Sequence, residues 1–227
     1  MPRRLPIKAE RVVGNLFIIL VFGTLVYVYF ASVCVVLGPR IASGTSNGIQ
    51  EITLAFYHFF LMMLLWSLVQ TIFWDPGQVP TFWGFHFGDH ESKRKRYWLI
   101  CNVFKPERWH HWSTCNRCVL NMDHHWPWVN NCIGFWNRKP FILLLVYVLL
   151  CAYLSVIILS IDLYYRLQSE YAIFNRGGQN YYGFTRLLIV VGAEVVTGAA
   201  SFMMTNFLKF HISLILDNKT TIEFLEK

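Results

Sequence analysis

Cysteine and histidine side chains are concentrated in one short segment, between residues 101 and 132. The segment holds four of the six cysteines and four histidines: Cys101, Cys115, Cys118, Cys132, His110, His111, His124 and His125. Thiolates and imidazoles at such close spacing, including the pair Cys115-x-x-Cys118, are typical of structural zinc sites. The alternative is a set of buried thiols without a metal. So short a segment, however, has too little apolar surface to fold without a cross-link such as a bound metal ion. The spacing therefore predicts bound zinc.

The chain around this segment is strongly apolar. Of its 227 residues, 55% are hydrophobic and 15% are charged, whereas soluble domains carry about 25% charge. Four apolar stretches are each long enough, at about 1.5 Å per residue, to cross a hydrocarbon core of about 30 Å. They are residues 12–37, 53–74, 141–161 and 187–208. The composition excludes a disordered chain and a secreted disulfide scaffold, and it predicts an all-α polytopic membrane protein with four transmembrane helices.

The positive charges indicate the topology. Sixteen of the 20 Lys and Arg residues lie in 1–11, 75–139 and 207–227, and the other four lie in 38–52 and 162–186. Because Lys and Arg are enriched on the cytosolic side of membrane proteins, we expect both termini and the 75–139 loop to be cytosolic. Tyrosines at the other ends of the spans fit an interfacial belt: Tyr27, Tyr29, Tyr164, Tyr165, Tyr181 and Tyr182.

The chain therefore divides into three parts. Residues 1–74 hold the N-terminal segment and the first two spans, 75–140 form a cysteine-rich cytosolic domain, and 141–227 hold the last two spans and a short tail. The loops 43–48 and 175–180 are short and rich in Gly, Ser and Asn, so we expect them to be connectors without chemistry. Function is expected in the 75–140 domain.

Several motifs occur in a fixed order along the chain. Inside the loop they are Lys105-Pro106-x-Arg108, Cys115-x-x-Cys118, Asp123-His124-His125 and Asn130-Asn131-Cys132; Asp75-Pro76-Gly77 follows the second span and Thr220-Thr221-Ile222-Glu223 follows the fourth. This arrangement resembles the DHHC protein S-acyltransferases, or palmitoyltransferases, over the whole chain. The resemblance implies a loop stapled by two structural zinc ions between the second and third spans. Members of that family continue past the last motif with a cytosolic tail, whereas this sequence stops at Lys227.

Three positions depart from the family pattern. The family has cysteine at positions 98, 112 and 126, where this chain has Trp98, Trp112 and Trp126. An indole offers no thiolate to a metal or to an acyl group. Cysteine and tryptophan codons differ only in the third base, and TGA encodes cysteine in some genetic codes and tryptophan in others. One hypothesis is therefore that TGA cysteine codons were translated as tryptophan, and the other is that the chain is a pseudoenzyme.

The resemblance also implies the ligands of each zinc ion. One site consists of position 98, Cys101, His111 and Cys118, and the other of position 112, Cys115, His125 and Cys132. With tryptophan at positions 98 and 112, each site keeps three protein ligands. Because structural zinc sites are closed tetrahedra, we expect both sites of the chain as written to bind zinc more weakly.

The reaction implied by the resemblance uses Asp123, His124 and position 126. Asp123 orients His124, His124 takes the thiol proton at position 126, and the thiolate attacks the thioester of palmitoyl-CoA. The acyl group then passes to a cysteine of a target protein. Thr221 supports Asp123 in the family, while Thr220 with Glu223 also fits a helix capping box, and both interpretations can hold together.

Other residues and partners follow from the same resemblance. Arg117, Arg138 and Lys139 are candidates to bind the CoA phosphates, whereas the cationic run 93–96 suits either CoA or anionic lipid headgroups. Asn131 is expected to satisfy buried polar groups near the site.

The expected partners are the lipid bilayer, palmitoyl-CoA and proteins with cytosolic cysteines near the membrane. No nucleic acid is expected, because the loop is tethered between two spans. We expect an integral endomembrane location, in the Golgi or ER, with the plasma membrane as a further option. The alternative function is a non-catalytic zinc-binding membrane scaffold, and the residue at position 126 discriminates between the two.

Overall fold

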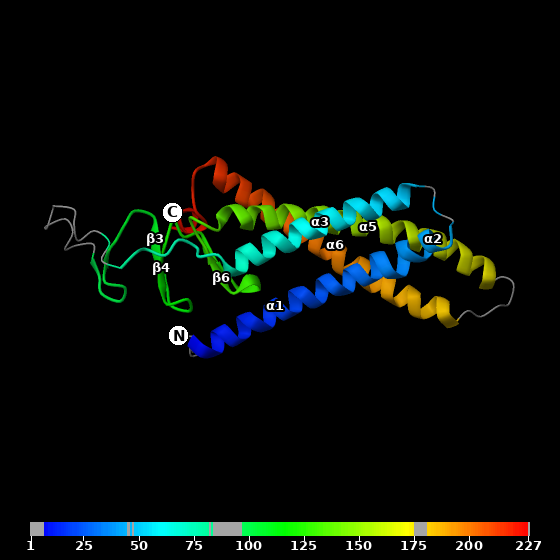
Figure 1. Ribbon diagram of the computed structural model, residues 1–227, viewed down its shortest axis with the longest axis horizontal. Helices are drawn as coiled ribbons and strands as arrows, with labels where there is room; N and C mark the ends of the chain where they lie inside the picture. The colour runs from blue at the N-terminus through cyan, green and yellow to red at the C-terminus, as the bar shows by residue number, and fades with distance from the viewer. Residues whose placement is uncertain are drawn as a thin grey trace. The chain divides into compact units, whose positions relative to one another are not determined.

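Long helices make up most of the chain. The computed structural model describes residues 7–44, 46, 48–81, 83, 97–174 and 181–226. The long helices are α1 (Ile7–Tyr29), α3 (Ile49–Phe73), α5 (Arg138–Phe174) and α6 (Tyr181–Leu216) (Figure 1). Within the described residues, four segments are long and apolar enough to cross a membrane: Arg11–Ala42, Ile49–Phe73, Arg138–Ser169 and Gly183–Leu216. The mostly helical architecture and the four candidate spans agree with the prediction.

Two helices extend well beyond the apolar stretches that predicted them. Helix α5 ends at Phe174, although its apolar stretch ends at residue 161, and α6 ends at Leu216, although its apolar stretch ends at residue 208. The added residues contain no glycine or proline, so nothing in the sequence stops the helix where the hydropathy falls. Hydropathy marks the part that can lie in the membrane, and helix propensity sets the full length.

The first span changes its hydrogen-bond pattern near its end. Helix α1 continues into a π-helical segment, η1 (Phe30–Leu37), and then into the short α2 (Gly38–Ala42). Pro39 lies in the first turn of α2, where it lacks an N–H group and its ring excludes the carbonyl one turn earlier. The Gly38 N–H group instead donates to the oxygen of Val33, five residues back.

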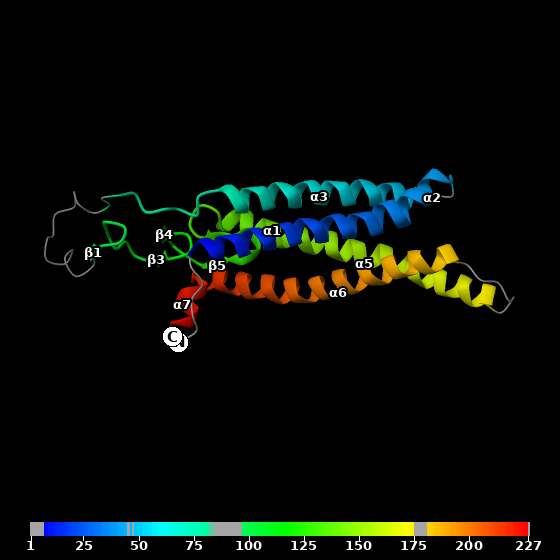
Figure 2. The same ribbon diagram turned by 90° about the horizontal axis from the view of Figure 1, so that it is seen from below.

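Residues Val21–Leu65 and Leu145–Lys209 form one of two compact units. The helices of this unit run alongside one another (Figure 2), and buried residues from each of them share one core, including Val36, Tyr57, Leu159 and Val190. Polar groups also bond between helices, since the Ser160 hydroxyl donates to Glu194 over 2.7 Å. This bond supplies the partner that a carboxylate needs within an apolar span.

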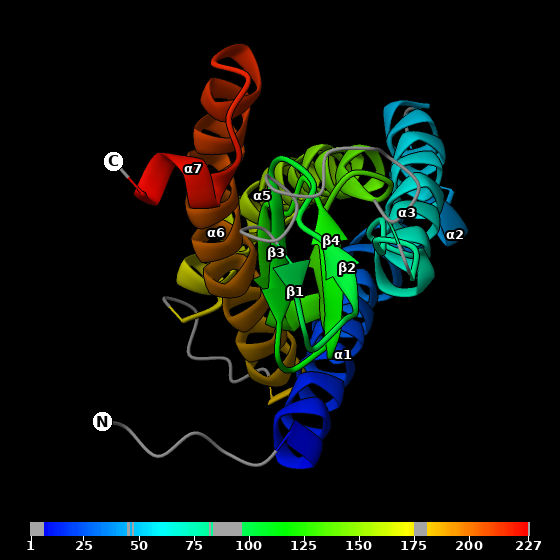
Figure 3. The ribbon, with the colours of Figure 1, turned by 90° about the vertical axis from the view of Figure 1, so that its left-hand side faces the viewer.

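The other unit contains Met1–Leu20, Trp66–Leu144 and Phe210–Lys227. Its cysteine-rich part forms three two-stranded antiparallel sheets, which Figure 3 shows in part. The strands pair as β1 (Tyr97–Trp98) with β2 (Val103–Phe104), β3 (Trp109–Trp112) with β4 (Arg117–Leu120), and β5 (His124–Trp126) with β6 (Asn131–Ile133). A short 3-10 helix, η2 (Pro127–Val129), joins the last two strands, and α7 (Thr221–Leu225) ends the described chain. The all-α prediction left these small sheets out.

Two motifs attach the end of α3 to these sheets. Asp75 accepts hydrogen bonds from the N–H groups of Gly77 and Gln78, both over 2.7 Å. Gly77 has a φ of +106°, a conformation that glycine adopts without strain, and its carbonyl accepts from the N–H group of Leu120 over 2.8 Å. The turn therefore places the chain that follows α3 alongside strand β4.

Asn131 completes the end of α3. Its amide nitrogen donates to the carbonyls of Thr71, Ile72 and Trp74 over 3.0, 3.2 and 2.9 Å. The last carbonyls of a helix have no partner within the helix, so a buried amide at this point satisfies them. Asn131 thus satisfies buried polar groups, as expected from the sequence.

Candidate functional site

The first cysteine and histidine cluster lies across strands β3 and β4. His111 pairs with Cys118 in the register of the sheet, and His111 Nδ1 lies 3.3 Å from Cys101 Sγ and 3.6 Å from Cys118 Sγ. A tetrahedral zinc ion with bonds of about 2.3 Å separates its ligand atoms by roughly 3.8 Å. The three ligand atoms therefore lie close enough together to bind one zinc ion, and the cluster could hold a metal.

The second cluster likewise combines a histidine and a cysteine from two paired strands, β5 and β6, with one cysteine from the preceding turn, Cys115. His125 pairs with Cys132, the sulfur atoms of Cys115 and Cys132 lie 3.3 Å apart, and His125 Nδ1 lies 3.5 Å from Cys115 Sγ. The hydrogen bond from Cys132 outweighs burial and, with His125 and Arg117 nearby, lowers the pKa of Cys115 to about 4. The same bond and burial raise the pKa of Cys132. One thiolate is thus already favoured at this cluster, which is the form that binds a metal.

Trp98 and Trp112 each contact the histidine of the cluster to which the resemblance assigns them. The centre of the Trp98 ring lies 5.9 Å from that of His111, and Trp112 stacks on His125 at 5.5 Å with 14° between the ring planes. The indole N–H group of Trp98 is buried and has no hydrogen-bond partner among the described residues. Leaving such a group unsatisfied costs about 1–3 kcal/mol. The ring of Trp98 nevertheless packs against the buried residues Val103 and Cys118, so the unmet requirement is confined to its N–H group.

Asp123 and His124 form a tightly held pair. Asp123 is fully buried, and its Oδ2 lies 2.6 Å from His124 Nδ1. Thr221 donates its backbone N–H group to Asp123 Oδ1 and its hydroxyl to Oδ2, both over 2.9 Å. Burial alone would raise the pKa of Asp123, but the bonds from His124 and Thr221 outweigh it and lower the pKa to about 2. The carboxylate stays ionised and fixes the ring of His124.

Successive side chains of strand β5 project to opposite faces, which separates the Asp123–His124 site from the second cysteine and histidine cluster. Residues two apart in a strand project to the same face, and the rings of His124 and Trp126 both contact Phe141, with centroid distances of 5.2 and 5.0 Å. His125 lies between them in sequence and projects toward the second cluster. A side chain at position 126 is therefore on the His124 side of the strand, away from the candidate metal ligands.

His211 is a member of this site that the sequence analysis missed. Its side chain is 1% exposed, its Nδ1 lies 3.6 Å from Asp123 Oδ2, and its ring centre lies 5.4 Å from that of His124. Together with Asp123 and His124, it forms a further group that could hold a metal ion. His211 lies beyond the predicted end of the fourth span at residue 208, and α6 continues through it to Leu216.

The remaining motifs position Thr221. Thr220 caps α7 through a capping box with Glu223, as predicted. Arg108 holds Glu223 from the loop, with Nε donating to Oε1 over 2.6 Å and Nη2 donating to Oε2 over 2.7 Å. This bond raises the pKa of Arg108 and lowers the pKa of Glu223. The loop thus orders α7, and α7 presents Thr221 to Asp123.

The three cationic candidates for phosphate binding differ in their surroundings. Arg117 donates to Asn131 over 3.1 Å, and Arg138 donates to the carbonyl of Lys219 over 2.9 Å and lies 3.7 Å from Asp123. Lys139 is exposed. The cationic run 93–96 and the loop 175–180 lie outside the described residues.

Comparisons with known proteins agree with these motifs. The DHHC palmitoyltransferase family matches residues 91–227. Probable protein S-acyltransferases 13 and 14 of Arabidopsis thaliana are each 35% identical to this chain, over 96% of this chain and 76% of the relative. Probable protein S-acyltransferase 12 of the same organism is 33% identical over 96% of this chain and 77% of the relative.

The chain therefore belongs to the DHHC palmitoyltransferase family. Relatives in this family are named protein S-acyltransferases, which supports acyltransferase chemistry on proteins in general. The four membrane-capable helices, together with this family, support an integral membrane protein.

Proposed function

We propose that the protein transfers a long-chain acyl group from acyl-CoA to cysteine thiols of other proteins, through a cysteine nucleophile at position 126. The observation that carries the proposal is the buried Asp123 carboxylate, which accepts two bonds from Thr221 and faces His124 Nδ1. A carboxylate bonded to one ring nitrogen fixes the tautomer and leaves the other nitrogen as a base. Such a pair serves a nucleophile beside it.

The transfer proceeds in two thioester exchanges. His124 takes the proton of a thiol at position 126, and the thiolate attacks the acyl-CoA carbonyl carbon. The carbon–sulfur bond to CoA breaks, and CoA leaves as a thiol after taking that proton from His124. A thiol of the target protein then attacks the acyl-enzyme in the same way, which releases the enzyme thiol.

The other side chains assist without touching the reacting carbon. Asp123 stabilises the protonated His124, and the bonds from His124 and Thr221 keep the pKa of Asp123 low. His211 packs beside both residues. Arg117, Arg138 and Lys139 are proposed to bind the CoA phosphates, since the two guanidinium groups match phosphate geometry and the lysine ammonium adds a point charge. We further propose that the site faces the cytosol and that both termini are cytosolic.

Zinc at the two clusters is proposed to have a structural role. Cys101, His111 and Cys118 hold one ion, and Cys115, His125 and Cys132 hold the other. A bound ion would link each hairpin to the turn of the preceding one, through Cys101 for β3 and β4 and through Cys115 for β5 and β6. The second ion would thereby fix β5, which carries both His124 and position 126.

The second candidate function is a non-catalytic zinc-binding scaffold in the membrane. Trp126 itself favours it, because an indole cannot form a thioester and its ring packs edge-on against the buried Phe141. The two functions differ in whether position 126 can carry an acyl group.

The test uses the full chain in detergent with palmitoyl-CoA. The variant Trp98→Cys/Trp112→Cys/Trp126→Cys should form a hydroxylamine-sensitive acyl adduct, and adding His124→Ala should abolish it by removing the base. The matched control keeps Trp126 and restores only positions 98 and 112; it should bind zinc and form no adduct. A triple variant that folds, binds zinc and stays inert would favour the scaffold.

A further inference from the structure

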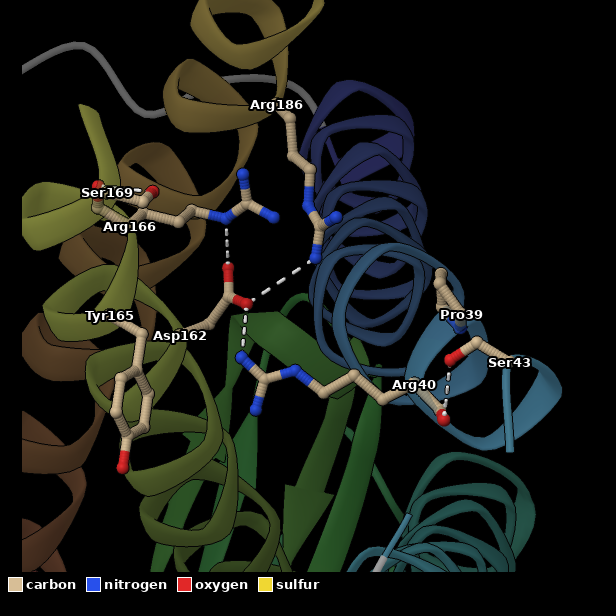
Figure 4. A pocket seen from close by; sticks show the side chains of 8 residues that line it. All are labelled: Pro39, Arg40, Ser43, Asp162, Tyr165, Arg166, Ser169 and Arg186. Atoms are coloured by element: carbon tan, nitrogen blue, oxygen red, sulfur yellow. Dashed lines mark hydrogen bonds and ion pairs between the residues drawn. The ribbon is translucent and has the colours of Figure 1, made fainter. Parts of the chain in front are cut away.

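A second polar site lies in the unit formed by Val21–Leu65 and Leu145–Lys209, at the ends of helices α2, α5 and α6 (Figure 4). It is a pocket of about 390 Å³. Its charged residues are Arg40 on α2, Asp162 and Arg166 on α5, and Arg186 on α6. The sequence predicted only connectors without chemistry near these ends.

One buried carboxylate stands at the centre of the pocket. Asp162 is 1% exposed, and three guanidinium groups converge on it. Arg40 Nη2 lies 2.8 Å from Oδ1, Arg166 Nε lies 2.5 Å from Oδ2, and Arg186 Nη2 lies 3.4 Å from Oδ1. Asp162 therefore holds three cations from three helices in one place.

The positive charge of the three guanidinium groups exceeds the negative charge of Asp162. Three cations share one anion among these lining residues, which leaves an excess of two positive charges. A carboxylate has about four acceptor sites, whereas each guanidinium has five N–H donors. The Nε atom of Arg186 is buried and has no hydrogen-bond partner among the described residues. Like charges held this close and partly desolvated repel each other, so an anion in the pocket stabilises the arrangement.

The positions of these residues indicate where the anion comes from. Arg40 follows the apolar run that ends at Leu37, and Arg166 and Arg186 stand on either side of the connection between α5 and α6. Tyr165 also lines the pocket, and tyrosines at span ends mark the depth of lipid headgroups. These positions, at the ends of the candidate spans, are those expected for a pocket at the level of phospholipid phosphates.

The charge bias of the chain makes this convergence unusual. The segments 38–52 and 162–186, which we expect on the non-cytosolic side, hold only four of the 20 Lys and Arg residues. Three of those four line this pocket. The positive-inside tendency disfavours arginine on that side, so a topological signal does not explain their presence.

We propose that this pocket binds the phosphate of an anionic phospholipid headgroup, with Arg40, Arg166 and Arg186 as donors and Asp162 holding the guanidinium groups in position. Arginine is suited to this ligand because its planar fork donates two parallel bonds to a phosphate. A phosphomonoester carries about −1.5 to −2 charges at neutral pH, which matches the excess of two. The proposal does not depend on acyl transfer.

The test measures lipid binding by the full chain. Delipidated protein in detergent is titrated with phosphatidic acid, with phosphatidylcholine as the reference lipid, and bound lipid is counted by native mass spectrometry. Arg186→Gln and Arg166→Gln should each weaken phosphatidic acid binding about tenfold or more, since each removes a charge-assisted donor pair. Arg186→Lys should restore part of the affinity, because it keeps the charge and loses the fork. The matched control is Lys209→Gln, which removes an exposed cation from the same helix and should leave binding unchanged.

Three results would overturn the proposal. The first is equal binding of phosphatidic acid and phosphatidylcholine by the wild-type chain. The second is unchanged binding in Arg186→Gln and Arg166→Gln protein that elutes and unfolds as wild type does. In the third, inorganic phosphate competes as strongly as phosphatidic acid, which assigns the pocket to a free anion instead of a lipid.

Discussion

Restoring cysteine at positions 98 and 112 is expected to turn two three-ligand clusters into closed zinc sites. A structural zinc ion contributes roughly 10–16 kcal/mol through four ligands, so one thiolate accounts for about 3 kcal/mol, or about 100-fold in affinity. At position 98, the change also removes a buried indole N–H group that has no hydrogen-bond partner among the described residues. That group is unsatisfied with or without zinc, so its removal changes fold stability, by about 1–3 kcal/mol. The expected gain in zinc affinity is therefore similar for Trp98→Cys and Trp112→Cys.

The assay is zinc content after dialysis against a chelator of intermediate affinity. The double variant should keep close to two zinc ions per chain, and the chain as written should keep fewer. The matched control is Trp128→Cys, which adds a thiol at a side chain that is 40% exposed and packs on Phe17; it should leave the zinc content unchanged. Two chelator-resistant zinc ions in a chain with verified Trp98 and Trp112 would refute the reasoning and would mean that another group completes each site.

Three further outcomes follow from contacts around Asp123 and the loop. In the cysteine-restored background, Thr221→Val should slow adduct formation about tenfold at unchanged zinc content, because it removes the hydroxyl bond to Asp123. Arg108→Ala should destabilise the fold by about 1 kcal/mol, since its bidentate bond to Glu223 is partly exposed. Because that bond lowers the pKa of Glu223, the stabilisation should be present at neutral pH and be lost as the pH falls through the lowered value. Asn131→Ala should destabilise by about 1–3 kcal/mol by leaving the end of α3 uncapped.

Each outcome has a measurement that decides it. Single-turnover labelling at saturating palmitoyl-CoA follows the Thr221 variant, and an unchanged rate would mean that Asp123 is held without the hydroxyl. Thermal unfolding at several pH values follows the Arg108 variant, and a constant difference down to acid pH would contradict the assignment to Glu223. For Asn131, an unfolding temperature equal to that of wild type would show that water replaces the amide.

The sequence was sufficient for the spans and for the composition of the two clusters. Long apolar runs indicate membrane helices directly, and the density of cysteine and histidine between residues 101 and 132 indicates metal binding. The spacing of Cys115 and Cys118 did not show that these two residues belong to different clusters. The grouping of Cys101 with His111 and Cys118 came from the family resemblance, and the structure brings those side chains together. No periodic pattern groups ligands that lie on different hairpins.

The small sheets and His211 were not predicted, for separate physical reasons. Strands of two to four residues are too short to show an alternating pattern. Their turns did leave a signal, since Asn102 and Asn116 directly follow cluster cysteines and have φ values of 52° and 49°, a region that asparagine tolerates. His211 lies beyond the predicted end of the fourth span at residue 208, so it was assigned to the tail instead of to the helix that carries it toward Asp123.

Peptide mass spectrometry of position 126, in protein purified from its source cells, tests the proposed nucleophile most directly. The peptide that follows Arg117 should be read before and after hydroxylamine treatment, together with the codon at position 126 of the transcript. An acyltransferase that uses this site should show cysteine at position 126, with a long-chain acyl group that hydroxylamine removes, and a TGA codon. Tryptophan in every copy of the peptide, encoded by TGG, would contradict the proposed nucleophile and would leave the zinc-binding scaffold as the function of this chain.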